Sequence, residues 1–449
     1  MSTQGYSARC AAIHLLRSGC SSQEVAEELS HSRSWVYKWR TRFQREGWIG
    51  LHDRSRTPHR QPTRHSDSIR QAIRRVRSEL EAEAEQPDQL SYIGARAIQS
   101  RLRHEKHSRI PSITSIEREL HAAGMTRPQR SPPPDKDVYP HLQPQQARQL
   151  VQVDIYPRYL QGGQAIACFN AIDVVSRYPT GMQYIRRRSK EAADFLVHTW
   201  QTVGIPTYTQ LDNEGCFSGG ATHPYVLGKV VKLALLVGTQ PVFSPFYHPA
   251  SNGFVERFHQ DYGHEVWQKI HLANIEAVRK HSLPFFQRYR NSEHHTALLG
   301  RSPAEVHTSG ASVELPSDFR IPKSLPLTEG QVHFMRQVDQ TRHVKILNVL
   351  WMVPEASPGQ GVWATLELRQ LGAKLRVFDA APDAPQRRCL VIHTFPLKEP
   401  VMPVASQFQR PCRTPAKRWR APLQAIVALF HDVVKVCSLV KVPIRSTMS

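Results

Sequence analysis

Three stretches near the middle of the chain decide the fold, and they read VQVDIY at 151–156, LDNEGCF at 211–217 and FYHPASNGFVERFH at 246–259. In the first stretch an acidic residue, Asp154, stands among alternating apolar residues, as in a half-buried β-strand. The second closes a β-rich run at Asp212, and the third starts a helix that carries Glu256 in its first turns. Three separate elements therefore contribute one carboxylate each.

The sequence around these stretches predicts a mixed β-sheet with helices packed against it. Runs that alternate or are rich in β-branched residues predict strands, and they lie at 149–155, 164–174, 180–185, 207–211 and 241–244. Helical spacing predicts a helix capped by Ser189, a second at 227–237 and a third from about 252. The order β-β-β-α-β-α-β-α is typical of an α/β domain, and we place it at 148–309.

Asp154, Asp212 and Glu256 form a candidate site for divalent cations. Two hard cations about 3.5–4 Å apart need anionic oxygen ligands that converge on one point, and three carboxylates can supply them. Each carboxylate alone also has a structural interpretation, because a lone Asp at a strand end is usually a turn former. A further acidic residue, Asp173, stays outside the candidate site, and we expect it to pair with Arg177 at a strand end.

Towards the N-terminus, residues 7–46 predict three helices within a domain at 1–58. The second helix begins with a capping box, in which the Ser21 hydroxyl and the Glu24 carboxylate each accept a backbone N–H that the helix leaves unpaired. A short helix, a tight turn and another helix are the elements of a helix-turn-helix unit.

The third of these helices has an apolar face and a polar, basic face. Val36, Trp39 and Phe43 share the apolar face. The opposite face suits the major groove of DNA, and its DNA-contact candidates are Arg33, Ser34, Tyr37, Lys38, Arg40 and Arg42. A three-helix domain with a solvated basic face remains the alternative.

The other regions predict further domains and connections. A second helical triplet, a helix-turn-helix or winged-helix-like domain, occupies 59–126. Six of the 21 residues at 127–147 are proline, which indicates a semi-extended linker. Short β-rich runs separated by glycines at 310–400 are typical of a small β-barrel. The stretch 401–449 is a basic tail whose apolar spacing also fits an amphipathic helix.

The composition favours a polyanionic partner. The 449 residues include 59 Lys and Arg against 38 Asp and Glu, a formal charge of +21, so nucleic acid is the first candidate and an anionic membrane the second. The seven cysteines contain no C-x-x-C pair, which argues against a structural zinc site and favours a reducing compartment. No apolar run is long enough to span a bilayer, so we expect an intracellular protein without membrane insertion.

Together with LLGRSPAEVH at 298–307, the three opening stretches resemble the integrase catalytic core that retroviral integrases share with insertion-sequence transposases. The resemblance covers about 148–309. It implies a ribonuclease H-like fold with a mixed five-stranded sheet. It also implies that Asp154, Asp212 and Glu256 are the catalytic carboxylates and hold two Mg²⁺ ions, for which Mn²⁺ can substitute. Helix-turn-helix units before the core and a small β domain after it resemble the organisation of bacterial transposases.

The resemblance implies a DDE-type transposase that cuts the ends of its mobile element and joins them to target DNA. It further implies double-stranded DNA as partner, a homo-oligomer on that DNA, and a cytoplasmic, nucleoid-associated location in a prokaryote. Residues around Glu256 are candidates to hold the DNA strand or its phosphates, although plain loop or solvent-facing roles stay open. These candidates are Tyr247, His248, Asn252, Arg257 and His259.

Two other functions remain open from the sequence. A DNA-binding regulator with a catalytically silent core would share the helix-turn-helix units, and a ribonuclease H or resolvase-type nuclease would share the fold and the metals. The sequence also departs from the family in three places, one of which is NSEHH at 291–295 in place of the usual Asn-x-x-Arg-Pro-His string; the other two lie closer to the carboxylates. Forty-three residues separate Asp212 from Glu256, and Glu214 stands where many relatives have glycine. Both departures leave the three carboxylates intact.

Overall fold

The computed structural model describes residues 3–53, 65–86, 89–107, 109–126, 139–219, 224–246, 248–293, 295–309 and 312–403. The chain divides into two compact units, Met1–Ser66 and Asp67–Ser449. The first part of the predicted linker and almost all of the predicted basic tail lie outside the described residues.

The first unit has the three helices that the sequence predicts, α1 (Thr3–Arg17), α2 (Ser22–Glu28) and α3 (Arg33–Glu46), followed by the short turn η1 (Gly47–Leu51). The capping box is confirmed, because the Ser21 amide donates to the Glu24 carboxylate at 2.7 Å and the Glu24 amide donates to the Ser21 hydroxyl at 3.3 Å. Val36 and Trp39 are buried in the small core of this unit.

The second unit begins with the second helical triplet, α4 (Asp67–Ala84), α5 (Ala95–His104) and α6 (Ile113–Ala122). Apolar side chains of all three helices form its core, with Ile116 and Leu120 among the buried ones. At its edge the Glu119 carboxylate is buried and accepts hydrogen bonds from Arg70 at 2.7 Å and from Arg74 at 2.5 Å.

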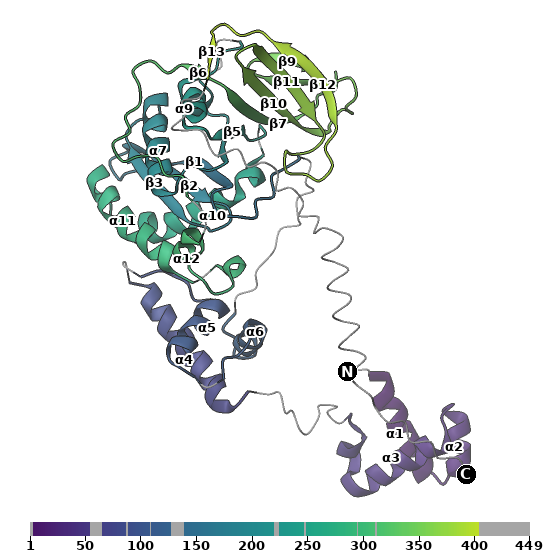
Figure 1. Ribbon diagram of the computed structural model, residues 1–449. Helices are drawn as coiled ribbons and strands as arrows, with labels where there is room; N and C mark the ends of the chain where they lie inside the picture. Colours follow the sequence, from purple (N-terminus) through teal and green to yellow (C-terminus); the bar gives the residue numbers. More distant parts are fainter. Residues whose placement is uncertain are drawn as a thin grey trace, which may run out of the picture. The chain divides into compact units, whose positions relative to one another are not determined.

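The centre of the second unit is one nine-stranded mixed sheet (Figure 1). Its predicted five strands are confirmed as β1 (Leu150–Tyr159), β2 (Ala165–Asp173), β3 (Pro179–Tyr184), β4 (Tyr208–Leu211) and β5 (Gln240–Phe243). β1, β2 and β3 form an antiparallel meander, and β4 and β5 continue from β1 in parallel. The strand order is β12-β11-β10-β7-β5-β4-β1-β2-β3.

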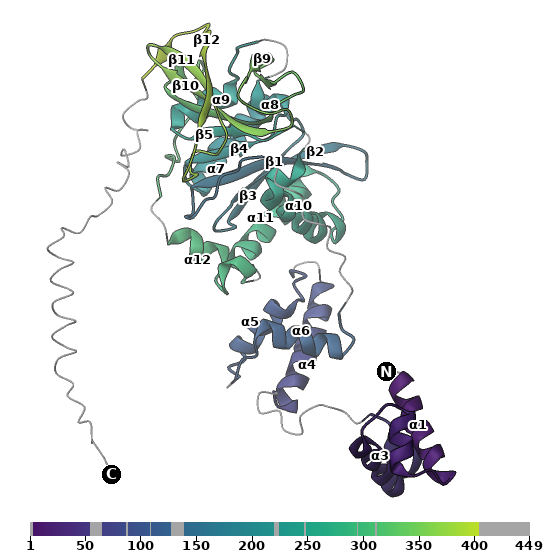
Figure 2. The ribbon, with the colours of Figure 1, turned by 90° about the vertical axis from the view of Figure 1, so that its right-hand side faces the viewer.

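Helices cover both faces of the strands β1 to β5 (Figures 1 and 2). Apolar side chains on one face share a core with α7 (Ser189–Thr202) and α9 (Lys229–Val237). The other face packs against α10 (Gly253–Tyr262), the π-helical segment η3 (Gly263–Gln268) and α11 (Ile275–Asn291). Because side chains alternate along a strand, Val151, Val153 and Ile155 enter the first core, and Asp154 faces α10.

Two details of these helices differ from the sequence interpretation. The residue that caps α7 is Arg188, and Ser189 is the first residue of the helix. α8 (Gly215–Ser218) and η2 (Pro249–Asn252) are extra short turns on either side of the site, and η4 (Thr296–Leu298) and α12 (Pro303–Thr308) follow α11.

The C-terminal strands continue the central sheet, and a closed β-barrel is not confirmed. β7 (Gly330–Gln337) pairs with β5 and is followed outward by β10 (Gly361–Arg369), β11 (Gly372–Phe378) and β12 (Cys389–Phe395). Within the described residues no pairing leads from β12 back to β7. This arrangement pairs the edge of β5, which would otherwise expose a row of unpaired backbone groups.

Two short two-stranded sheets complete the C-terminal region. β6 (Leu327–Thr328) pairs with β13 (Val401–Met402). The run from Lys345 to Val353, a single β-rich run in the sequence, is divided between β8 (His343–Ile346) and β9 (Val349–Met352). Leu347 and Asn348 make the hairpin turn with φ of 48° and 60°, as a tight hairpin requires.

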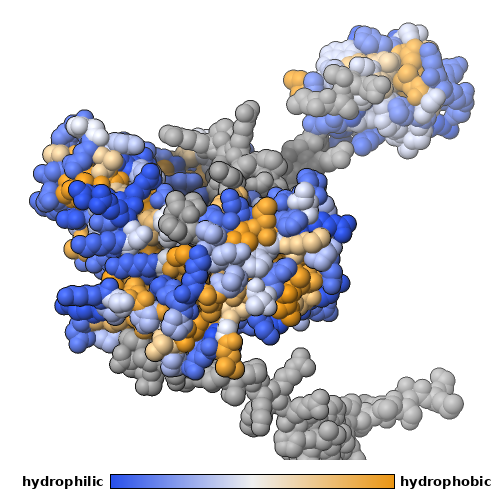
Figure 3. Space-filling model, turned by 90° about the horizontal axis from the view of Figure 1, so that it is seen from above, coloured by the Kyte–Doolittle hydropathy of each residue, from blue (hydrophilic) through white to orange (hydrophobic). Residues whose placement is uncertain are grey.

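The surface of the larger unit mixes hydrophilic and hydrophobic residues, and the hydrophobic ones form several separate patches on the face shown in Figure 3. Large exposed side chains on the C-terminal strands include Leu350, Met352 and Ile392. Among the described residues, no helix has the length and apolar character needed to cross a membrane.

Candidate active site

The three predicted carboxylates lie on three elements that meet at one end of the central strands. Asp154 lies on β1, Asp212 directly follows β4, and Glu256 is in the first turn of α10. β1 and β4 run parallel with Gln152 opposite Gln210. Asp154 and Asp212 each lie two residues beyond these glutamines, so the two aspartates lie at the same level of the sheet.

The charges of these carboxylates act on one another across a partly buried space. Burial, followed by the field of Asp212, raises the pKa of Asp154 to about 7, and Glu256 and Glu214 contribute in the same direction. Burial raises the pKa of Asp212 to about 6, while the hydrogen bond from the Glu214 amide lowers it and the charge of Glu214 raises it. Burial also raises the pKa of Glu256. Ionising all three without a counter-charge therefore costs free energy.

The carboxylate oxygens of the site are suitable ligands for a hard divalent cation, although their positions do not form a complete metal site. Within the described residues no three side chains of His, Cys, Asp or Glu form a group that could hold a metal ion. Carboxylate oxygens are the ligands that Mg²⁺ prefers. The neighbouring Cys216 offers no competing thiolate, because burial raises the pKa of its thiol to about 12. A cation between the carboxylates would offset their mutual repulsion.

Backbone amides and one ion pair fix the two aspartates. The Ile155 amide donates to Asp154 Oδ1 at 2.8 Å, and the Glu214 amide donates to Asp212 Oδ1 at 3.1 Å. The Glu214 side chain forms an ion pair with Arg187 at 3.1 Å. Glu214 therefore positions the aspartate beside it while adding negative charge to the site.

Two buried glutamines hold the start of α10 against the sheet. Gln152 Oε1 accepts the amides of Phe254 at 3.1 Å and Val255 at 3.3 Å, so it satisfies helix N–H groups that have no partner within the helix. Gln210 Nε2 donates to the Ser251 carbonyl and to Asn252 Oδ1, both at 2.7 Å. The glutamines thus set the position of the helix that carries Glu256.

A buried arginine on β7 performs the same task for the loop after Asp212. Arg336 is 5% exposed, and its guanidinium donates to Asn213 Oδ1 and to the Ser244 carbonyl, both at 2.9 Å. A third hydrogen bond goes to the Lys345 carbonyl at 3.0 Å. Burial lowers its pKa to about 9, so the group is still charged at neutral pH. Through Arg336, the C-terminal strands therefore support the loop that follows Asp212.

Replacing Arg336 by methionine is expected to lower the free energy of unfolding by about 2–4 kcal/mol, because the buried Ser244 carbonyl and two partly buried acceptors lose a charged donor. Urea denaturation of the full chain measures the change. Arg369→Met on the exposed end of β10 is the control for the same chemical change. An equal decrease in the free energy of unfolding of both variants would contradict the supporting role of Arg336.

Residues 237–303 match the integrase core domain family. This stretch of the chain is similar to an integrase core domain. The matched stretch includes β5, α10 and α11, and therefore Glu256, whereas Asp154 and Asp212 precede it. Residues 9–78 match a winged helix-turn-helix family, and this match runs from α1 into α4. Both matches confirm the resemblance that the sequence motifs indicate.

Solved structures similar to this chain include several from retroviruses. The simian T-cell lymphotropic virus intasome matches at 15% identity and a TM-score of 0.33, over 72% of this chain and 100% of that one. The HTLV-2 integrase catalytic core in complex with magnesium matches at 12% identity and a TM-score of 0.28, and the match covers 36% of this chain and 97% of that one. The catalytic core of BIV integrase matches at 20% identity and a TM-score of 0.28, and the match covers 36% of this chain and 95% of that one.

The candidate DNA contacts around Glu256 divide into buried and exposed residues of the integrase core. Asn252 is buried and accepts hydrogen bonds from Gln210 and Ser244. His248 pairs with Ser251 at 2.9 Å. The Arg257 side chain is 64% exposed and pairs with Asp261 at 3.1 Å. Tyr247 lies outside the described residues.

His259 is buried one turn after Glu256, between the helix and β1. Its ring stacks on Tyr156 with centroids 4.7 Å apart, and Nδ1 lies 3.7 Å from Asp154 Oδ2. Burial, followed by Arg158, lowers its pKa to about 3, so the ring is neutral and this contact is not an ion pair. The structure thus places His259 beside a catalytic candidate, where it is shielded from solvent.

The predicted groove-facing side chains of α3 are mostly free to meet DNA. Arg33, Ser34, Tyr37, Lys38 and Arg40 are all exposed. Arg42 differs, since its guanidinium lies 4.6 Å from the centre of the Trp39 ring and donates to the His52 carbonyl at 3.1 Å. This side chain therefore contacts its own domain, where its charge supports the packing of the helix.

Asp173 is structural, but its carboxylate does not bind the expected arginine. It accepts hydrogen bonds from the hydroxyl and amide of Ser176, at 2.8 and 2.6 Å, and from the Arg148 amide at 2.5 Å. The Arg177 guanidinium instead lies 4.0 Å from the ring centre of Phe254. The tight turn after β2 brings backbone amides nearer to the carboxylate than the arginine side chain.

Proposed function

We propose that the protein is a DDE-type transposase that binds the ends of its mobile element, cleaves them and joins them to target DNA. One observation carries the proposal: an integrase core whose Asp154, Asp212 and Glu256 stand on β1, after β4 and on α10, where burial raises the pKa of each. Such a carboxylate group is suited to holding divalent cations for phosphoryl transfer.

In this mechanism Asp154, Asp212 and Glu256 would hold the cations. Two Mg²⁺ ions, or Mn²⁺ in their place, would supply activation of the attacking oxygen and stabilisation of the leaving oxygen. Gln152 and Gln210 keep the helix of Glu256 in position, and the neutral His259 buttresses Asp154. The attacking group is first water and then a DNA hydroxyl, so the protein needs no Ser, Tyr or Cys nucleophile.

Sequence recognition belongs to the helix-turn-helix units in this proposal. The exposed polar face of α3 enters the major groove at the element ends, and basic residues contact phosphates there. Cutting and joining two DNA ends together calls for at least two copies of the chain, so we propose a homo-oligomer on DNA. We also propose a cytoplasmic, nucleoid-associated location in a prokaryote.

Replacing Arg33 and Lys38 by alanine is expected to weaken binding to element ends. If each makes one phosphate contact, the slope of log affinity against log salt falls by about one per residue. Gel shifts at several salt concentrations measure both quantities, and Arg17→Ala, an exposed position on α1, is the control. Unchanged affinity and slope in the double variant would show that α3 does not contact the DNA.

The proposed activity is tested with the full chain and DNA taken from both flanks of its gene, in buffer with Mg²⁺. We expect cleavage at inverted repeats and joining of the cut strands to a second DNA. Binding without cleavage would instead indicate a DNA-binding regulator. Cleavage of RNA–DNA hybrids or branched DNA, without joining, would indicate a ribonuclease H or resolvase-type nuclease.

A further inference from the structure

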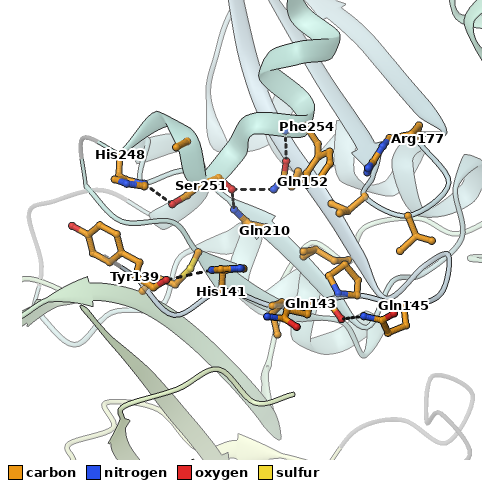
Figure 4. Close-up of a pocket in the computed structure, with 17 residues that line it drawn as sticks. Tyr139, His141, Gln143, Gln145, Gln152, Arg177, Gln210, His248, Ser251 and Phe254 are labelled. Atoms are coloured by element: carbon orange, nitrogen blue, oxygen red, sulfur yellow. Dashed lines mark hydrogen bonds between the residues drawn. The ribbon is translucent and has the colours of Figure 1, made fainter. Parts of the chain in front are cut away.

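A cavity of about 570 Å³ lies beside the site, between the segment 139–145 and the residues around Ser251 (Figure 4). This segment is anchored, since the Gln143 amide donates to Asp383 at 2.6 Å and Leu142 is buried among apolar residues of the sheet. The volume is in the range of small-molecule sites. None of the residues that line the cavity is acidic, so an anionic group can enter it without repulsion from its walls.

The two ends of the cavity differ in chemistry. Tyr139 and His248 lie at one end in Figure 4, with ring centroids 4.9 Å apart. Arg177 lies at the other end, over the ring of Phe254. Its Nη1 is buried and has no hydrogen-bond partner among the described residues. The cavity thus offers aromatic rings at one end and a cation at the other.

Amide side chains line the space between these ends. Gln152 and Gln210 form the wall towards the carboxylates, where both donate to the Ser251 carbonyl, at 3.0 and 2.7 Å. Each stands two residues before a catalytic aspartate on its strand, which is about 7 Å along an extended chain. Whatever occupies the cavity therefore lies close to the DNA strand that reacts.

We propose that this cavity takes one unstacked nucleotide, with its base beside Tyr139 and His248 and its phosphate at Arg177. Aromatic rings hold unstacked bases of any sequence, and arginine binds phosphate. The identification of the nucleotide as part of the reacting DNA strand rests on the proposed function. A free nucleotide has the same chemistry, and the experiment separates the two sources.

The test uses the full chain with single-stranded oligonucleotides that carry one 5-iododeoxyuridine, and separately with free deoxynucleoside 5′-monophosphates. We expect light-induced crosslinks from the oligonucleotide to map to the lining residues between 139 and 145 or between 248 and 254. Two variants are expected to lower oligonucleotide affinity about tenfold, as loss of one stacked base does. Arg177→Gln removes the cation, and Gln145→Trp fills the cavity from its exposed rim without changing charge.

Arg387→Gln is the matched control, because Arg387 also stacks on an aromatic ring, 3.4 Å from the centre of Phe378, but lies outside the cavity. Thermal unfolding of each variant shows that the fold is retained. Crosslinks elsewhere, with affinity unchanged in Gln145→Trp, would overturn the proposal. So would binding of free nucleotides without crosslinks from DNA. A wild-type chain that crosslinks as expected but never joins DNA would overturn the proposed function and leave the nucleotide site standing.

Discussion

Replacing Asp212 by asparagine is expected to abolish DNA cleavage and joining while binding to element ends stays near wild type. Asparagine keeps the shape of the side chain and removes one negative charge from the cation site. Loss of an anionic ligand costs several kcal/mol of transition-state stabilisation, and each 1.4 kcal/mol is about tenfold in rate. Turnover is therefore expected to fall by about a thousandfold or more.

Cleavage and joining assays in Mg²⁺ and in Mn²⁺, next to gel shifts without metal, measure the two effects of this change. Asp194→Asn is the control, because Asp194 is an exposed aspartate of α7 outside the site. It is expected to retain activity. An Asp212→Asn protein that still cuts DNA in Mg²⁺ would contradict the carboxylate mechanism.

Replacing Asp154 by asparagine is expected to stabilise the metal-free protein at pH 8 by about 2–4 kcal/mol. Its pKa of about 7 in the folded protein lies above the ordinary value of 3.8, and each unit corresponds to about 1.4 kcal/mol. The folded state thus binds this proton more tightly than the unfolded state. Its ionisation destabilises the fold progressively as the pH rises from about 4 to about 7.

The difference in unfolding free energy between variant and wild type is therefore expected to be large at pH 8 and to vanish near pH 4. Urea denaturation at a series of pH values without metal measures it. Buried histidines such as His333, whose pKa burial lowers to about 3, destabilise both proteins equally on acidification, so they cancel in the difference. If Asp154→Asn increased the free energy of unfolding by the same amount at every pH, the charge of Asp154 would not be the cause of the increase.

The sequence carries enough information for the five central strands, and it singles out the three carboxylates as candidates, because both signals are local. Alternation identifies β1, and a carboxylate inside that alternation marks Asp154 as unusual. Turn residues after β4 and helical spacing after residue 252 identify the elements of Asp212 and Glu256. The match to the integrase core domain family supports this interpretation for β5 and the helix of Glu256, which lie within residues 237–303.

Other features depend on contacts between distant parts of the chain, which local patterns do not reveal. Arg336 follows Asn213 by more than a hundred residues, and its hydrogen bonds exist only because β7 pairs with β5. The same pairing turns the expected barrel strands into an extension of the sheet. Gln152 and Gln210 had a local signal, since each polar side chain stands two residues before an aspartate on the same face of its strand.

Binding of Mn²⁺ to the full chain, followed by electron paramagnetic resonance at pH 8, tests most directly the central claim that Asp154, Asp212 and Glu256 hold the catalytic cations. The account predicts bound Mn²⁺ in the wild type and in Asp194→Asn. It predicts strongly reduced binding in Asp154→Asn, Asp212→Asn and Glu256→Gln. Binding in all three site variants at the wild-type level would contradict it.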